Sequence, residues 1–181
     1  MTLYQEKYRI ESARLRGWDY RTRGWYFVTM CAQNRKCIFG QIVGSQVQLS
    51  RLGRIAESEL QNVPCHYQNV QIDSFVVMPN HVHALIAIDG DYCFSSNTTH
   101  SSSADIAPSC FSPPRAGSLS AIVRSYKAGV THRCRELGLR RDVWQPRFHD
   151  HLARGDGVIS AIRDYICNNP ANWAEDHENR P

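Results

Sequence analysis

Two apolar segments joined by a Pro-Asn turn constrain the fold of this chain most strongly. Residues 70–78 (VQIDSFVVM) and 81–88 (HVHALIAI) are rich in β-branched and apolar side chains, as strands are. Pro79-Asn80 between them is typical of a tight turn. We therefore predict a β-hairpin. Because apolar residues fill most of its second strand, we expect that strand to be a rigid, buried element.

The remaining segments alternate between strand and helix patterns. We predict strands over 25–33, weakly around 41–49, and over 147–153. Helices are predicted over 51–62, capped by Ser50 and ended by Pro64, over 119–137, and over 157–169, stopped by Pro170. Strand pairs that alternate with helices indicate an α+β fold in which helices cover an antiparallel sheet.

Composition excludes several classes of protein. The 181 residues fit a single domain, 42% of them are hydrophobic, and no apolar run reaches the ~20 residues of a membrane span. With no apolar signal-peptide region at the N-terminus, we expect a cytoplasmic protein. None of the seven cysteines forms C-x-x-C, which argues against a zinc ribbon. Residues 94–118 are rich in Ser and Pro and are predicted to be a loop insertion.

Positive charge is clustered along the chain, although the net charge is only +4. Residues 1–24 and 118–154 are rich in Arg and Lys, whereas residues 55–110 contain neither. Such clusters suit a polyanion such as nucleic acid, and equally suit a solvated surface. The candidates for DNA contact are Arg124, Lys127, Arg147 and Arg154.

His81 and His83 are the sharpest candidates for chemistry. Side chains two apart on a strand point to the same face, with Cβ atoms about 6–7 Å apart. Two imidazoles at that spacing can converge on one metal ion. On this motif alone, a pair of buried structural histidines is an equal alternative.

The last predicted helix offers a second set of candidates. Tyr165 and Asn169 are four residues apart and so share a helix face. Two imidazoles plus an amide oxygen would leave open positions on a divalent cation, which suits Mg²⁺ or Mn²⁺ better than structural zinc. Those positions could take phosphate oxygens while the Tyr165 phenol acts as nucleophile. A core tyrosine beside a helix-end Asn remains the alternative.

A second H-x-H motif, His149-Asp150-His151, is a rival metal site. It lacks the apolar flanks of the first motif. We therefore expect Asp150, His151 and the nearby Gln145 to support the metal site from outside its ligand shell rather than to bind the ion.

Four strings resemble a known family. FVVMPNHVHALI (75–86) resembles the metal-binding strand of the HUH single-tyrosine transposases. DYICNNPANW (164–173) is similar to the tyrosine helix of their REP-associated branch, which reads Y-I-x-x-N-P-x-x-W. VWQPRFHDHLAR (143–154) and SYKAGVT (125–131) resemble two further family segments, and all four occur in the family's order.

The resemblance implies a ferredoxin-like or RRM-like core. It further implies that His81, His83 and Asn169 bind a divalent metal, and that Tyr165 forms a 5′-phosphotyrosine link to single-stranded DNA, releasing a 3′-hydroxyl. Substrates of the REP-associated branch are palindromic repeats folded as hairpins, and the chain would act as a monomer or a homodimer.

Two other functions stay open from the sequence. A replication or plasmid-mobilisation nickase would share this chemistry and differ in its DNA context. A nucleic-acid-binding module without catalysis would form no covalent adduct with DNA.

Overall fold

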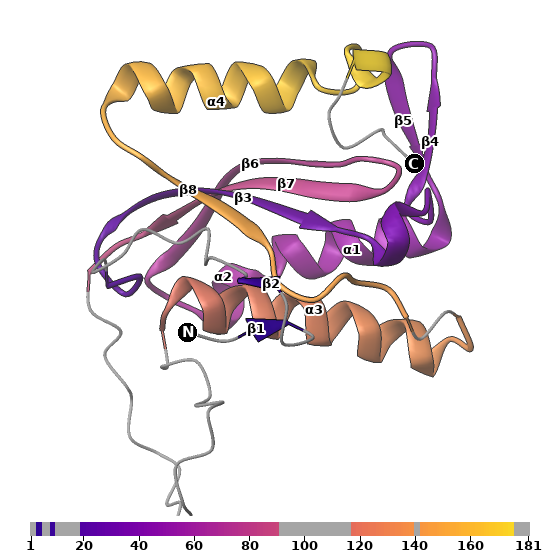
Figure 1. The fold of residues 1–181 in the computed structure, drawn as a ribbon, viewed down its shortest axis with the longest axis horizontal. Helices are drawn as coiled ribbons and strands as arrows, with labels where there is room; N and C mark the ends of the chain where they lie inside the picture. Colours follow the sequence, from indigo (N-terminus) through magenta and orange to yellow (C-terminus); the bar gives the residue numbers. More distant parts are fainter. Residues whose placement is uncertain (1–2, 5–7, 10–18, 91–116, 140–141, 176–181) are drawn as a thin grey trace, which may run out of the picture.

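A four-stranded antiparallel sheet separates two layers of helices (Figure 1). The computed structural model describes residues 3–4, 8–9, 19–90, 117–139 and 142–175. The strands of the sheet are β3 (Gly24–Cys31), β6 (Val70–Val77), β7 (His81–Ile88) and β8 (His149–Ala153). One helical layer contains α1 (Arg51–Gln61), α2 (Val63–His66) and α3 (Leu119–Glu136). On the other side of the sheet lies α4 (Asp156–Asn168).

The shorter elements lie outside this sheet. They are β1 (Leu3–Tyr4), β2 (Tyr8–Arg9), β4 (Gly40–Val43), β5 (Gln46–Leu49) and two 3₁₀ turns, η1 (Gln33–Arg35) and η2 (Trp173–Glu175). β1 pairs with β2, and β4 pairs with β5. The insertion predicted at 94–118 lies outside the described residues except at its last two positions.

The topology is ferredoxin-like. The core elements follow one another as β3, α1, β6, β7, α3 and β8, and the sheet order is β6-β7-β3-β8. Each strand–helix–strand unit therefore returns across the same face, which leaves the opposite face for α4. The prediction of an α+β fold with an antiparallel sheet covered by helices is confirmed.

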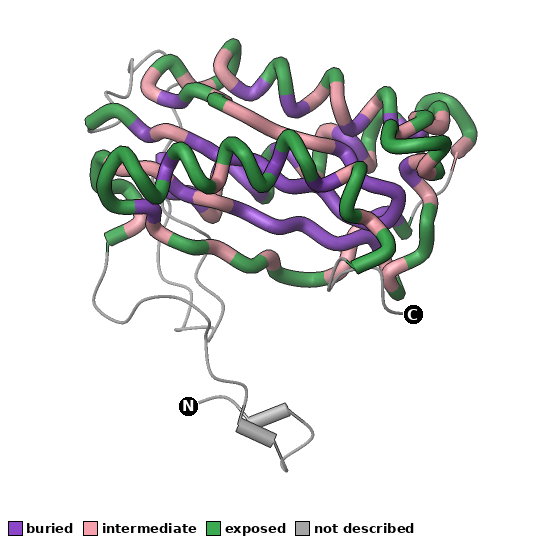
Figure 2. The backbone as a smooth tube through the Cα atoms, turned by 90° about the horizontal axis from the view of Figure 1, so that it is seen from above, coloured by how far each residue is buried: buried purple, intermediate pink, exposed green. Residues whose placement is uncertain are grey.

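Alternation along the strands creates two apolar layers. On the α1 and α3 side, β3 contributes Tyr26, Val28 and Met30, all 0% exposed. On the α4 side, Leu85 of β7 packs with Ile159 and Ile166. β7 is therefore buried on both faces, which explains its almost unbroken apolar sequence (Figure 2).

Two details of the sequence prediction were wrong. Residues 41–49 form a hairpin rather than one strand, because Gly44 supplies a turn with φ of 63°. Pro64 does not end α1, which stops at Gln61, but stands in the first turn of the short helix α2. A proline is tolerated there because the first amides of a helix have no intrahelical acceptor.

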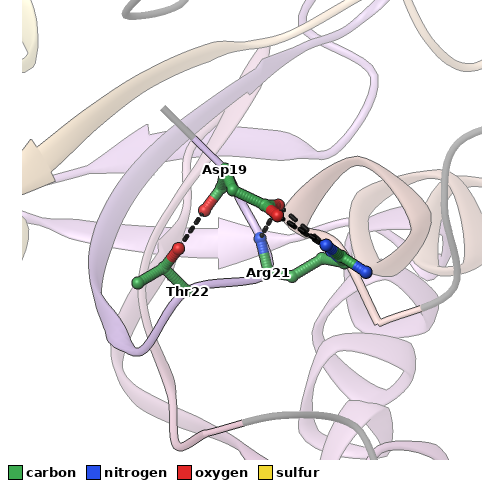
Figure 3. Close-up of polar contacts among 3 residues, drawn as sticks. All are labelled: Asp19, Arg21 and Thr22. Atoms are coloured by element: carbon green, nitrogen blue, oxygen red, sulfur yellow. Dashed lines mark hydrogen bonds and ion pairs between the residues drawn. The ribbon is translucent and has the colours of Figure 1, made fainter. Parts of the chain in front are cut away.

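A polar turn aims the chain into β3 (Figure 3). The Asp19 carboxylate accepts from the Arg21 backbone amide at 3.1 Å and from the Arg21 guanidinium at 2.6 Å. The Thr22 hydroxyl donates to the Asp19 carbonyl at 2.6 Å. The Tyr26 hydroxyl in turn donates to the Thr22 carbonyl at 2.9 Å, which ties the turn to the core.

Within the described residues, no helix is long and apolar enough to cross a membrane.

Candidate functional site

The two histidines of β7 lie side by side on the α4 face of the sheet. β3 pairs Cys31 with His81 and Thr29 with His83. The imidazole centroids are 4.3 Å apart, and the residues are 0% and 2% exposed. Strand alternation thus brings the rings together, as the sequence spacing predicts.

Each imidazole has its Nδ1 atom held by a neighbouring polar side chain. His83 Nδ1 shares a 2.9 Å hydrogen bond with Thr29 Oγ1, and His81 Nδ1 lies 2.8 Å from Asn80 Oδ1. Because an amide oxygen can only accept, His81 donates through Nδ1 and keeps its lone pair on Nε2. This arrangement orients an imidazole for metal binding through Nε2.

The surroundings of His81 keep its ring neutral. Burial, and secondarily the charge of Arg35, lowers the pKa of His81 to about 3. The ring centroid of Trp173 lies 6.0 Å from that of His81. A neutral imidazole at physiological pH is the form that binds a metal.

Tyr165 reaches the histidine pair from α4. Its hydroxyl lies 3.4 Å from His83 Nε2, and its ring makes an edge contact with Phe27 at 5.9 Å between centroids. The residue nevertheless remains 46% exposed. The phenol therefore borders the histidine pair and is open to a large substrate.

Asn169 caps the end of α4, one turn beyond Tyr165, and Trp173 follows it four residues later. Both of those residues contact the histidine pair, so Asn169 belongs to the same edge of the site. It is 3% exposed, and its Oδ1 atom has no hydrogen-bond partner among the described residues. A buried amide oxygen without a partner is costly unless it meets an ion or water.

These donors fit a divalent cation. The part of the chain that the structure describes has no cluster of three His, Cys, Asp or Glu side chains that could hold a metal. An ion bound here would therefore take two imidazole nitrogens and the Asn169 oxygen. Three protein ligands leave positions for phosphate oxygens or water.

A bidentate ion pair fastens α4 to the sheet near Tyr165. Arg163 donates through Nε and a terminal nitrogen to the two carboxylate oxygens of Asp73, both at 2.8 Å. Asp73 stands at a bulge between Ile72 and Ser74 in β6, and bulges re-aim side chains. Arg163 also lies over the Trp25 ring, 5.5 Å from its centroid. Tyr165 thus lies two residues after an arginine that two hydrogen bonds attach to the sheet.

The structure separates the residues of the second H-x-H motif. Asp150 pairs with Val28, whose side chain faces the α1 and α3 core, so it lies on the opposite face from the histidine pair. His151 pairs with Phe27 and faces the α4 side. The Gln145 amide donates to the Cys31 carbonyl at 3.0 Å, next to the strand position opposite His81. The structure brings His151 to the site's side of the sheet, holds the Gln145 backbone beside Cys31, and does not bring Asp150 to that side.

The four cations proposed for DNA contact are also divided. Arg124 and Lys127 belong to α3, on the far side of the sheet from Tyr165. The Lys127 ammonium donates to the Gln145 carbonyl at 3.0 Å and to the Arg147 carbonyl, so it tethers the segment before β8. Arg147 and Arg154 are exposed at either end of β8.

Sequence reasoning missed Thr29, Asn80 and the Arg163–Asp73 pair. Asn80 directly precedes His81 in the hairpin turn, so its position was a usable signal. Thr29 is 54 residues from His83, and Asp73 is 90 residues from Arg163. Nothing local marks those two contacts.

Comparison with known proteins gives relatives in sequence and in structure. An uncharacterized protein of Haemophilus influenzae is 38% identical over 165 residues, covering 91% of this chain and 90% of that protein. The REP-associated tyrosine transposase of Escherichia coli is 27% identical over 152 residues, covering 83% and 68%. No family model matches the chain.

A solved structure shares the fold. A REP-associated tyrosine transposase bound to a REP hairpin superimposes with a TM-score of 0.57 at 23% identity, over 88% of this chain and 73% of that one. The resemblance predicted from the four sequence motifs is confirmed. The chain belongs to one family with the Haemophilus influenzae protein and is related in sequence and in fold to the REP-associated tyrosine transposases.

Proposed function

We propose that the chain is a DNA transposase that cleaves and rejoins single-stranded DNA through Tyr165. The observation that carries the proposal is the 3.4 Å approach of the Tyr165 hydroxyl to a buried imidazole pair, with the buried Asn169 side chain four residues further along the chain. The relationship to REP-associated tyrosine transposases supports the same activity.

His81, His83 and Asn169 would hold Mg²⁺ or Mn²⁺. The ion would polarise the scissile phosphate and stabilise the charge that develops on its oxygens. Thr29 and Asn80 would fix the orientation of the two imidazoles through their Nδ1 atoms. A neutral phenol with a pKa near 10 is a weak nucleophile, so activation of the phosphate compensates for it.

Tyr165 supplies the covalent step. Its phenolic oxygen attacks the phosphorus, the bond from phosphorus to the 3′-oxygen breaks, and the phenol proton leaves as the 3′-oxygen gains one. The DNA 5′ end is then a phosphotyrosine, which keeps the energy of the original phosphodiester bond. Attack by a 3′-hydroxyl reverses the step and joins two strands, because the phenolate departs.

We infer that the substrates are palindromic repeats folded as single-stranded hairpins. The support is the solved relative, which is bound to a REP hairpin. The half-exposed Tyr165 suits a substrate that approaches along the surface. A replication or mobilisation nickase would cut an origin hairpin instead.

Incubation with single-stranded hairpins from the DNA flanking the gene tests the proposal. With Mn²⁺ or Mg²⁺, the protein should form a DNA adduct that survives a denaturing gel, and chelation should abolish it. Tyr165→Phe should bind the hairpin and form no adduct. An adduct formed by Tyr165→Phe, or none by the parent on any flanking hairpin, would refute the proposal.

A further inference from the structure

The edge strand β8 carries a row of side chains that the catalytic chemistry does not use. His149 pairs with Thr29, the same β3 residue that pairs with His83 on the other side. His151 pairs with Phe27, the residue whose ring contacts Tyr165. Because paired residues of a sheet share a face, both β8 imidazoles lie on the Tyr165 side, one strand beyond β3.

Among the described residues, this face of β8 is exposed around His149 and His151, whereas Ala153 at its end packs against α4. α4 packs mainly on β6 and β7, the strands farthest from β8. His149 and His151 are both exposed, in contrast to the buried pair on β7. β8 is also the last strand of the sheet in the described structure, so no further strand covers it.

Positive charge lies at both ends of this strand. Exposed Arg147 and Arg154 stand at its two ends. The acid within it, Asp150, turns to the opposite face. β8 thus has two imidazoles about 7 Å apart on the Tyr165 face, and an exposed arginine lies just beyond each end of the strand.

We propose that this β8 surface, made of Arg147, His149, His151 and Arg154, binds the single-stranded DNA that runs past Tyr165. Proteins that bind single strands combine cations that follow the phosphates with flat rings on which bases stack, and the β8 surface offers both. One strand, β3, lies between this surface and the site. Its Phe27 contacts the Tyr165 ring and its Thr29 bonds to His83, so the surface is continuous with the site. The inference that the bound DNA is a substrate rests on the proposed function. The inference that the β8 surface binds single-stranded DNA does not.

Binding of oligothymidylate tests this surface without knowledge of the target sequence. We would measure fluorescence anisotropy with chelator present and Tyr165→Phe as parent, so that no cleavage occurs. His149→Ala with His151→Ala should weaken binding about 10-fold or more, because each stacked base contributes about 1–3 kcal/mol, an effect of about 5- to 150-fold. Arg147→Gln with Arg154→Gln should flatten the dependence of log K on log salt by about 1.4, or about 0.7 for each phosphate released.

The controls separate this inference from general loss of charge or folding. His132→Ala and Arg135→Ala alter exposed residues of α3, on the far side of the sheet, and should leave affinity unchanged. Binding of a DNA duplex should change little in any variant. Equal affinity in the β8 variant and its parent, or an equal loss for duplex, would overturn the proposal.

The outcome is independent of the test of catalysis. If the unsubstituted protein forms no covalent adduct with any flanking hairpin but the β8 variant loses oligothymidylate binding, the surface stands and the transposase proposal falls. If the adduct forms and the β8 variant binds as its parent does, the surface falls alone.

Discussion

At the scale of single residues, the site depends on side chains that touch no substrate. Thr29 and Asn80 each engage the Nδ1 atom of one imidazole. This leaves the Nε2 atoms for other contacts, and that of His83 lies 3.4 Å from the Tyr165 hydroxyl. Partners of this kind set the tautomer and the ring orientation of metal-binding histidines.

Replacing Thr29 with Val should weaken Mn²⁺ binding about 10- to 100-fold. Valine keeps the shape and the strand propensity but removes the 2.9 Å hydrogen bond to His83. Isothermal titration calorimetry with Mn²⁺ measures the effect. Thr131→Val on α3 is the matched control, since the Thr131 hydroxyl donates to the Lys127 carbonyl of the same helix. Unchanged Mn²⁺ affinity in Thr29→Val would show that the threonine does not orient the ligand.

The depressed pKa of His81 predicts a dependence of stability on pH. The folded protein would protonate His81 only near pH 3, whereas the unfolded chain does so near pH 6.5. Below pH 6.5 the unfolded state therefore binds a proton that the folded state lacks, and the free energy of unfolding falls as pH decreases toward 3. The total contribution is at most about 5 kcal/mol. Urea titrations in EDTA should show a shallower fall for His81→Gln than for the parent, and identical curves would contradict the assignment.

At the scale of elements, α4 presents the nucleophile, and its attachment is polar as well as apolar. Ile159 and Ile166 pack against the sheet on the inner face of α4. Arg163 forms an ion pair with Asp73 at the β6 bulge. An exposed ion pair adds only about 0–1 kcal/mol to stability. Its value here is positional, because two parallel hydrogen bonds fix the helix two residues before Tyr165.

Asp73→Asn should slow adduct formation about 10-fold and leave the melting temperature nearly unchanged. The loss of one charged partner loosens α4 without exposing core residues. A small displacement of the reacting phenol lowers the rate of the chemical step strongly. Single-turnover gels with saturating hairpin give the rate of adduct formation. Arg163→Lys keeps a positive charge opposite Asp73 and should therefore slow this rate less than Asp73→Asn does. Glu136→Gln breaks an exposed pair with Arg133 elsewhere and serves as control. A parental rate in Asp73→Asn would exclude a positioning role.

The elements that sequence patterns predict well are those with local causes. The strand β7 has the bounds 81–88 that its apolar run predicts, and alternation along it places His81 and His83 on one face. The 41–49 segment was misassigned because one glycine turn divides a weak apolar pattern. Contacts such as Asp73–Arg163 depend on the strand order and on a bulge, and neither follows from local periodicity.

At the scale of the whole molecule, one chain assembles the site. Tyr165 from α4 and His83 from β7 approach within 3.4 Å in a single polypeptide. The ferredoxin-like topology makes this possible, since α1 and α3 cover one face of the sheet and leave the other for α4.

Two inactive variants should therefore fail to complement each other. A mixture of Tyr165→Phe with His81→Ala/His83→Ala should form no adduct above the sum of the separate proteins. A site shared between subunits would instead place an intact tyrosine beside an intact imidazole pair and restore activity. Denaturing gels at several protein concentrations make the comparison, with parent protein diluted into either variant as the positive control.

Pulsed electron paramagnetic resonance of Mn²⁺-loaded protein tests most directly whether an ion rests between the two β7 imidazoles. Modulation from two imidazole nitrogens is expected, falling to one in His83→Ala and persisting in Tyr165→Phe. A bound Mn²⁺ that shows no nitrogen coupling, or coupling that survives the loss of both His81 and His83, would contradict the account.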